Sequence, residues 1–227
     1  MATLSRMSGC ETAGRQLRKD AERNRQRVIE AARELFASRG LEATLNDVAH
    51  HARLGVGTVY RRFPTKEDLF EAIFEDGVNQ LTGLAESALR EDDSWDGFER
   101  FVTGMCELTA TDRGMREAAF SKNYGGKRVN AARDRLLPPM TKLVERVQND
   151  GYLRHEVSSS DMPILGLLAG TVSEYAGHVD PELWRRYVAI LLEGMRCRDD
   201  QLPIEVSALD DEQLETAMQT WHPAGPR

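Results

Sequence analysis

Residues 44–63 read TLNDVAHHARLGVGTVYRRF and predict two short helices separated by a tight break. The first helix has a start signal, because the Thr44 side chain can accept the backbone N–H of Asp47 while the Asp47 carboxylate answers it in a capping box. The break at residues 53–55 is too short for the helices to lie antiparallel, so they must cross steeply. The stretch therefore predicts a helix-turn-helix.

The second helix of this stretch has an inner and an outer face that residue spacing distinguishes. Val59 and Phe63 are four residues apart and define the inner, apolar face. At about 100° per residue, the opposite side carries a bare backbone position, a guanidinium fork and two flanking hydroxyls. Such groups suit entry into a DNA groove. They belong to Gly57, Arg61, Thr58 and Tyr60.

The flanking residues extend this small domain in both directions. Pro64 ends the second helix, and Thr65 opens another capped helix. Lys66 then lies in a first helical turn, beside exposed N–H groups that favour an anion such as phosphate. Upstream, apolar residues recur at helical spacing and Gly40 supplies a left-handed stop. We therefore expect three helices and the start of a fourth to share one core.

Residues 25–70, RQRVIEAARELFASRGLEATLNDVAHHARLGVGTVYRRFPTKEDLF, resemble the N-terminal DNA-binding domain of the TetR family of one-component transcriptional repressors. The resemblance rests on the AARELF run at 31–36, Gly40, the helix at 44–52, the GTVYRRF segment at 57–63 and the capped helix that contains Lys66. These features are specific as a set, although no single one is. The residues expected to contact DNA are Thr44, Gly55, Val56, Gly57, Thr58, Tyr60, Arg61 and Lys66.

Two positions depart from the family pattern. Arg53 stands where the family usually has glycine in the turn between the helices, so either the turn is built differently or Arg53 bears some strain at a positive φ. Gly55 and Val56 stand where the family often has Ser-Lys. This difference removes a cap and a phosphate contact, and it can place a methyl group against a thymine. The base preference of the family therefore does not carry over.

Charge divides the chain at the same place. Residues 1–66 contain 13 Lys and Arg against 7 Asp and Glu, a net charge of +6. Residues 67–227 contain 17 against 30, a net charge of −13. A DNA duplex attracts the first segment and repels the second, which orients the molecule before any base is read.

Length and composition exclude several protein classes. No apolar run is nearly as long as the roughly 20 residues needed to span a bilayer. The first residues lack the apolar core of a secretory signal. We therefore expect a cytoplasmic protein with no membrane association. Cys10, Cys106 and Cys197 lack CxxC or CxxH spacing, so neither a disulfide framework nor a metal site is expected, and no cofactor is implied.

The rest of the chain predicts helices only, and hence an all-α fold. Helical periodicity covers residues near 66–90, 94–111, 113–122, 127–150, 160–178 and 181–196, with a weak helix at about 207–220. We expect an N-terminal three-helix helix-turn-helix domain followed by a larger helical ligand-binding and dimerisation domain. The expected parts are a flexible N-terminal arm at 1–20, the DNA-binding domain at 21–69, the effector-binding and dimerisation domain at 70–200 and a C-terminal extension at 201–227.

The helices near 160–178 and 181–196 carry more apolar surface than the edge of one monomer needs. The family resemblance implies that they form a four-helix bundle with their copies in a homodimer. A two-fold dimer would present two recognition helices to successive major grooves of a palindromic operator. The alternative is that both helices are simply core. The expected interface residues are Leu165, Leu168, Val172, Trp184 and Leu191.

The resemblance also implies a cavity for a small-molecule effector in the larger domain. The residues expected to line it are Phe98, Phe101, Met105, Phe120 and Tyr124. Each of them can equally be a packed core residue, because aromatic side chains at helical spacing usually pack against one another.

The motifs of an enzyme are missing from the sequence. It has no phosphate-cradling glycine loop, no GxSxG, no HExxH and no Cys/His pairing in a catalytic context. We therefore predict a transcriptional regulator that binds double-stranded DNA, and on the family resemblance a repressor released by a small-molecule effector. The alternative is a DNA-binding helix-turn-helix protein without small-molecule input.

Overall fold

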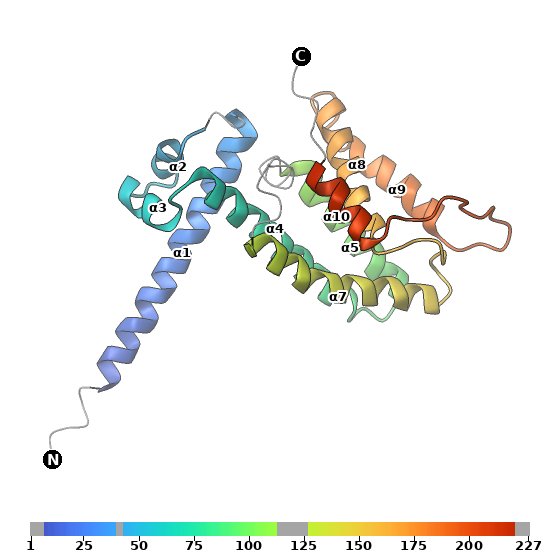
Figure 1. Cartoon of the computed structure of the whole chain (residues 1–227), viewed down its shortest axis with the longest axis horizontal. Coiled ribbons are helices and arrows are strands. Elements are labelled where there is room, and N and C mark those ends of the chain that lie inside the picture. Colours follow the sequence, from blue (N-terminus) through green and yellow to red (C-terminus); the bar gives the residue numbers. More distant parts are fainter. Residues whose placement is uncertain (1–6, 40–42, 113–126, 221–227) are drawn as a thin grey trace. The chain divides into compact units, whose positions relative to one another are not determined.

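The computed structural model of the chain describes residues 7–39, 43–112 and 127–220 (Figure 1). Within these ranges the chain is all-α, as the sequence predicts, and its one extended pairing is the isolated bridge between Leu153 and Arg196. The helix predicted at 113–122 lies outside the described residues. The helices are α1 (Met7–Arg39), α2 (Leu45–His51), α3 (Val56–Arg62), α4 (Lys66–Ala88), α5 (Ser94–Thr111), α7 (Lys127–Asn149), α8 (Asp161–Ala176), α9 (Leu183–Met195) and α10 (Asp211–Thr220).

The chain divides into two compact units, Met1–Leu69 and Phe70–Arg227. The first unit, called the head below, holds α1, α2, α3 and the first turn of α4. The second unit, called the body, holds the rest of α4 and all later helices. The boundary therefore falls inside a continuous helix.

The head has a single apolar core to which each of its helices contributes. Val28, Ile29, Ala32, Leu35 and Phe36 of α1 are buried, as their helical spacing predicts. The capping box at the start of α2 forms as expected, with the Asp47 N–H donating to Thr44 Oγ1 at 3.2 Å and the Thr44 N–H donating to Asp47 Oδ2 at 2.8 Å. Arg27 Nη2 donates to the Ala52 carbonyl at 2.7 Å, which satisfies a free carbonyl at the end of α2.

Helix α1 is helical from Met7 onward, a state that the sequence analysis did not predict for residues 7–20. This segment lacks apolar periodicity. The residues that join it to the buried part of α1, 15–27, read RQLRKDAERNRQR and are rich in Arg, with Gln, Leu, Lys, Ala and Glu, which favour the helix intrinsically. A helix that is already nucleated by a buried segment extends with one hydrogen bond per added residue, so a polar extension needs no core of its own.

The turn between α2 and α3 resolves the two alternatives left open for Arg53. Arg53 adopts φ 54°, in the left-handed region that favours glycine. Its N–H donates to the His50 carbonyl at 3.1 Å, and the Leu54 N–H donates to the Ala49 carbonyl at 3.0 Å. These bonds close the end of α2 around a strained residue.

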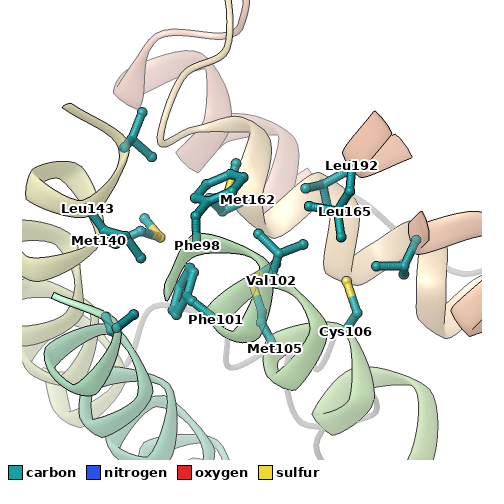
Figure 2. Close-up of a cluster of buried hydrophobic side chains, with 14 of the residues drawn as sticks. Phe98, Phe101, Val102, Met105, Cys106, Met140, Leu143, Met162, Leu165 and Leu192 are labelled. Atoms are coloured by element: carbon teal, nitrogen blue, oxygen red, sulfur yellow. The ribbon is translucent and has the colours of Figure 1, made fainter. Parts of the chain in front are cut away.

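The body is built around α5, which packs along α8 and also contacts α7 and α9. Figure 2 shows Phe98 and Phe101 of α5 lying among side chains of α7 and α8, including Met140, Leu143 and Met162. Small residues let α5 and α8 approach closely, since a Cβ placed on Gly166 would lie 3.3 Å from the Thr109 side chain.

Arg146 of α7 fixes the connection between α4 and α5. Its guanidinium donates to the carbonyls of Leu89, Glu91 and Asp92 at 3.0, 2.8 and 3.1 Å. Asp93 then caps α5 by accepting the N–H groups of Trp95 and Asp96. The connection is therefore held by charge-assisted hydrogen bonds as well as by packing. None of the described helices is long and apolar enough to cross a membrane.

Replacing Arg53 by glycine is expected to stabilise the head. The substitution relieves about 1–2 kcal/mol of left-handed strain and costs about 0.5–1 kcal/mol of backbone entropy, so the free energy of unfolding should rise by about 0.5–1 kcal/mol. Arg53→Ala is the matched control, because it removes the same side chain and keeps Cβ. Chemical denaturation of both variants measures the difference, and equal stabilities would show that Arg53 is not strained.

Candidate nucleic-acid interface

Helix α3 has one buried and one exposed face, arranged as its sequence predicts. Val59 and Phe63 are 0% and 1% exposed and belong to the core of the head, whereas Tyr60 is 43% exposed. Gly57 and Arg61 are also exposed, and Thr58 is half-buried. Packing inside the head therefore leaves a donor-rich surface on α3 that nothing in the head covers.

Arg61 and Thr58 are neighbours on this outer face. Arg61 Nη2 donates to Thr58 Oγ1 at 3.4 Å, a long bond between exposed groups. The guanidinium has five N–H donors in a fixed fork, so this bond engages one of them and orients the others. A fork of this kind can donate two bonds to one guanine or to a phosphate.

Neither the packing of the head nor its backbone conformation requires a glycine at position 57. A Cβ built on it meets no atom within 4 Å, and its φ is not positive. Alanine would also be the better helix former at this position. A glycine with room for a side chain suits a surface that another molecule approaches closely.

The start of α3 lacks a side-chain cap, as the departure at Gly55 and Val56 predicts. Gly55 is the N-cap and has φ −64°, so its backbone does not require glycine. Val56 follows and is 37% exposed. An exposed apolar side chain at the entry to α3 is available for a thymine methyl group.

Lys66 lies at the start of α4, beside the head core. Its Nζ is 5.5 Å from the centre of the Phe36 ring, within reach of a cation–π interaction. Thr65 and Asp68 form the expected capping box, with the Asp68 N–H donating to Thr65 Oγ1 at 3.1 Å. The Asp68 carboxylate already accepts a backbone N–H at the start of α4. The group at this end that can attract a phosphate is therefore the Lys66 ammonium.

Thr44 differs from the other residues expected to contact DNA. Its hydroxyl accepts the Asp47 N–H and donates to Asp47 Oδ2 at 2.7 Å, so both of its functions are used in the capping box. The side chain holds α2 in place. A contact between Thr44 and DNA stays a prediction, as do those of Gly55, Val56, Gly57, Thr58, Tyr60, Arg61 and Lys66.

Sequence reasoning missed two contacts that brace the helix-turn-helix against α1. Arg62, next to Arg61, lies 3.7 Å from Glu22. His51 of α2 contacts the Glu34 carboxylate. Both pairs join residues far apart in the sequence, so local spacing gave no signal for them.

The residues expected to line an effector cavity belong to the packed core of the body. Phe98, Phe101 and Met105 are buried among α7 and α8 (Figure 2). Phe120 and Tyr124 lie outside the described residues. Cys106, in the same core, has its pKa raised to about 12 by burial, so its thiol stays protonated and unreactive.

The residues expected to form a dimer interface divide into core and surface. Leu165 and Trp184 are buried within the body itself, which corrects their expected place on an exposed face. Val172 and Leu191 are partly buried against the same core. Leu168 of α8 is 45% exposed, and Ile190 of α9 is 54% exposed. Periodicity placed these helices correctly but could not tell which apolar stripe meets α5.

The comparisons with known proteins agree with both units. Residues 28–73 match the family model of bacterial regulatory proteins of the tetR family. Residues 93–197 match that of the C-terminal domain of SbtR-like transcriptional regulators. A solved TetR transcription regulatory protein from Mycobacterium vanbaalenii is 30% identical with a TM-score of 0.58, and the match covers 79% of this chain and 99% of that one. The chain belongs to the TetR family.

Other TetR relatives extend over both units. The HTH-type transcriptional regulator SrpR of Pseudomonas putida is 25% identical over 191 residues, which cover 84% of each chain. A solved TetR regulator from Streptomyces coelicolor is also 25% identical, with a TM-score of 0.58, and the match covers 76% of this chain and 98% of that one. This TetR-family protein is therefore a DNA-binding transcriptional regulator.

The open position at Gly57 generates the first test of the DNA surface of this TetR regulator. Gly57→Ala should stabilise α3 by up to about 1 kcal/mol, yet it should weaken operator binding by about 1–3 kcal/mol, the cost of a methyl group inserted into a close contact. Gly83→Ala is the matched control, because Gly83 is an exposed glycine of α4 with equally open surroundings. Fluorescence anisotropy with an operator selected from random DNA measures both, and unchanged affinity in Gly57→Ala would show that DNA does not approach here.

Substitutions of Arg61 and Lys66 should lower DNA affinity in different ways. Arg61→Ala should cost about 1–3 kcal/mol and relax the preference at one base pair, because the guanidinium fork reads a base edge. Lys66→Ala should weaken binding to all sequences alike and lower the salt slope by about one unit, because the ammonium meets phosphate. Arg90→Ala, in the acidic body, controls for the loss of one charge. Equal losses on operator and random duplexes in both variants would contradict base reading by Arg61.

Proposed function

We propose that this regulator is a repressor that binds a palindromic double-stranded operator as a homodimer and is released from it by a small-molecule effector. The observation that carries the proposal is the outer face of α3. Tyr60 and Arg61 are exposed there, on a helix whose opposite side is fixed by the burial of Val59 and Phe63. Burial makes this surface rigid, which reduces the ordering cost of binding.

The chemistry of each exposed group assigns it a role toward DNA. The Arg61 fork reads a guanine edge in the major groove, and Val56 contacts a thymine methyl group. The Lys66 ammonium and the Tyr60 hydroxyl bind the phosphate backbone and set the register of α3. The net charge of +6 over residues 1–66 draws the head to the duplex, while the net charge of −13 over the remainder keeps the body away.

Two heads are needed for tight binding, because a single module makes few contacts. Leu168 on α8 and Ile190 on α9 expose apolar side chains, with Tyr175 and Tyr187 on the same two helices. A soluble monomer rarely leaves such a patch uncovered. A two-fold dimer through α8 and α9 would cover it and place two copies of α3 about 34–36 Å apart, one turn of DNA.

Release by an effector would act through α4, which begins in the head and continues into the body. A ligand that shifts α4 changes the spacing of the two α3 helices, so operator affinity falls without unfolding the heads. By reciprocity, operator DNA must weaken effector binding by the same factor, typically about 5- to 150-fold. A γ-butyrolactone receptor, 22% identical with a TM-score of 0.56, has the same fold.

The packing of the body favours one alternative, a regulator without small-molecule input. Phe98, Phe101 and Met105, three of the residues expected to line an effector cavity, are buried in the core of the body. In this alternative the body serves dimerisation alone, and operator occupancy follows the concentration of the protein.

Ile190→Glu tests the dimer and its link to DNA binding. A carboxylate buried at an apolar interface is costly, so the variant should sediment as a monomer and lose most of its operator affinity. Leu202→Glu is the matched control, because Leu202 is an exposed leucine that belongs to neither α8 nor α9. Analytical ultracentrifugation gives the mass of each variant. A dimeric Ile190→Glu variant with full operator affinity would contradict assembly through α9.

A further inference from the structure

The segment between α9 and α10, residues 198–210, crosses the surface of the body without regular structure and is called the strap below (Figure 1). Two hydrogen bonds, at neighbouring positions of the strap, hold it to the segment before α8. Arg154 Nη2 donates to the Leu202 carbonyl at 2.6 Å, and the Ile204 N–H donates to Glu156 Oε1 at 3.3 Å. Beyond the strap, α10 buries Leu214. The strap is therefore tied to the body at residues 202–204 and is followed by a helix with a buried leucine.

The anchor at Glu156 is a charged pair. Arg154 lies 3.1 Å from Glu156 Oε1, and this hydrogen bond, with those of backbone N–H groups, lowers the pKa of Glu156 to about 2. Arg154 also bonds the Leu202 carbonyl, so its charge is engaged within the anchor. The carboxylate of Glu156 stays ionised near neutral pH.

A pocket of about 220 Å³ lies between the strap and the ends of α8 and α9. Ile164 of α8 and Met195 of α9 form its floor, and Ile204, Val206 and Ala208 of the strap form its wall. These side chains are apolar, as in most small-molecule sites, and the volume is below the about 300–1,000 Å³ of sites for drug-sized ligands. A single ring or a short alkyl chain matches it.

The strap does not fill this space itself. Val206 lines the pocket and is nevertheless 81% exposed, and Ile204 is also exposed. Burying such apolar area is worth about 25 cal/mol per Å². A ligand seated under the strap would gain this contribution from side chains that are already in place.

The charged side chains that line the pocket favour one kind of ligand. The lining carboxylates are Glu156 and Asp161, and the charge of Glu156 is already paired with Arg154. The attraction for a charged ligand therefore depends on Asp161. Asp161 Oδ2 accepts the Ser158 N–H at 2.8 Å. An anionic ligand would be repelled here, whereas a cation would be attracted.

We propose that this pocket binds a small organic cation, a protonated amine on a single ring or short alkyl chain. The apolar part would lie between Met195 and Val206, and the ammonium would face Asp161, with the Ser207 hydroxyl at the rim. None of the lining residues belongs to α3, whereas Val157 and Leu165 belong to the core cluster of the body that also contains Phe101. The proposal does not depend on DNA binding.

Methyl NMR of the full chain with ¹³C-labelled methionine methyl groups tests the site. The probes are benzylamine, benzyl alcohol and benzoate, which share a ring and differ in charge. Met195 lines the pocket and is assigned with Met195→Leu, while the fully buried Met162 serves as the internal reference. The Met195 resonance should shift saturably with benzylamine. Benzyl alcohol should shift it with several-fold lower affinity, and benzoate should not shift it.

Two variants separate the charge from the cavity. Asp161→Asn can still accept the Ser158 N–H and should lower benzylamine affinity several-fold while leaving benzyl alcohol unchanged. Ala208→Leu should fill the pocket and abolish binding of both, whereas Ala217→Leu, at an exposed position of α10, should leave binding intact. Equal shifts with all three probes, no saturation with benzylamine, or full binding by Ala208→Leu would each overturn the proposal.

Discussion

The burial of Val59 and Phe63 determines which side of α3 faces solvent. A rotation of α3 by one residue, about 100°, would expose these side chains and lose about 1.5–3 kcal/mol for each. The same rotation would turn polar side chains toward the core, where an unpaired guanidinium is costly. The face that carries Arg61 is therefore fixed by the core beneath it, and the base reading that we propose for Arg61 depends on that packing.

The strained turn before α3 serves the same arrangement. A left-handed residue lets α2 end and α3 begin within three positions, and this chain accepts arginine there at φ 54°. The bond from Arg27 to the Ala52 carbonyl stabilises the end of α2 next to this turn. Helix α1 thus stabilises the turn through Arg27. A strained residue such as Arg53 persists when the surrounding contacts hold its backbone in place.

Apolar residues of the body have two different roles that look alike in the sequence. Those of α5 face α7 and α8 and form a filled core, while Leu168 and Ile190 remain at the surface. A filled core stabilises the body, and an exposed patch provides a surface for a second copy. The strap adds a third case, in which apolar side chains surround an incompletely filled space.

The sequence predicted those features that depend on local spacing. The bounds of α5 and the capping box of Thr44 and Asp47 agree with the prediction, because caps and periodicity are encoded by near neighbours. The two faces of α3 follow from the four-residue spacing of Val59 and Phe63.

Features that depend on long-range contacts were missed. Trp184 has the same apolar signal as Ile190, yet only the packing against the rest of the body shows that Trp184 is buried. The helical state of residues 7–20 was missed because propensity without apolar periodicity was not considered. The pocket under the strap is lined by residues of α8, of α9 and of the segment after Leu202. These residues are far apart in the sequence, so no local pattern predicts the pocket.

The central claim is that two α3 helices occupy successive major grooves of one duplex. Dimethyl sulfate protection on an operator selected from random DNA tests it directly, because the reagent marks guanine N7 in the major groove and adenine N3 in the minor groove. The account predicts N7 protection in two patches whose centres lie about 10–10.5 base pairs apart, with adenine N3 unprotected between them. Protection of adenine N3 alone, or a single patch of N7 protection with a dimeric protein bound, would contradict it.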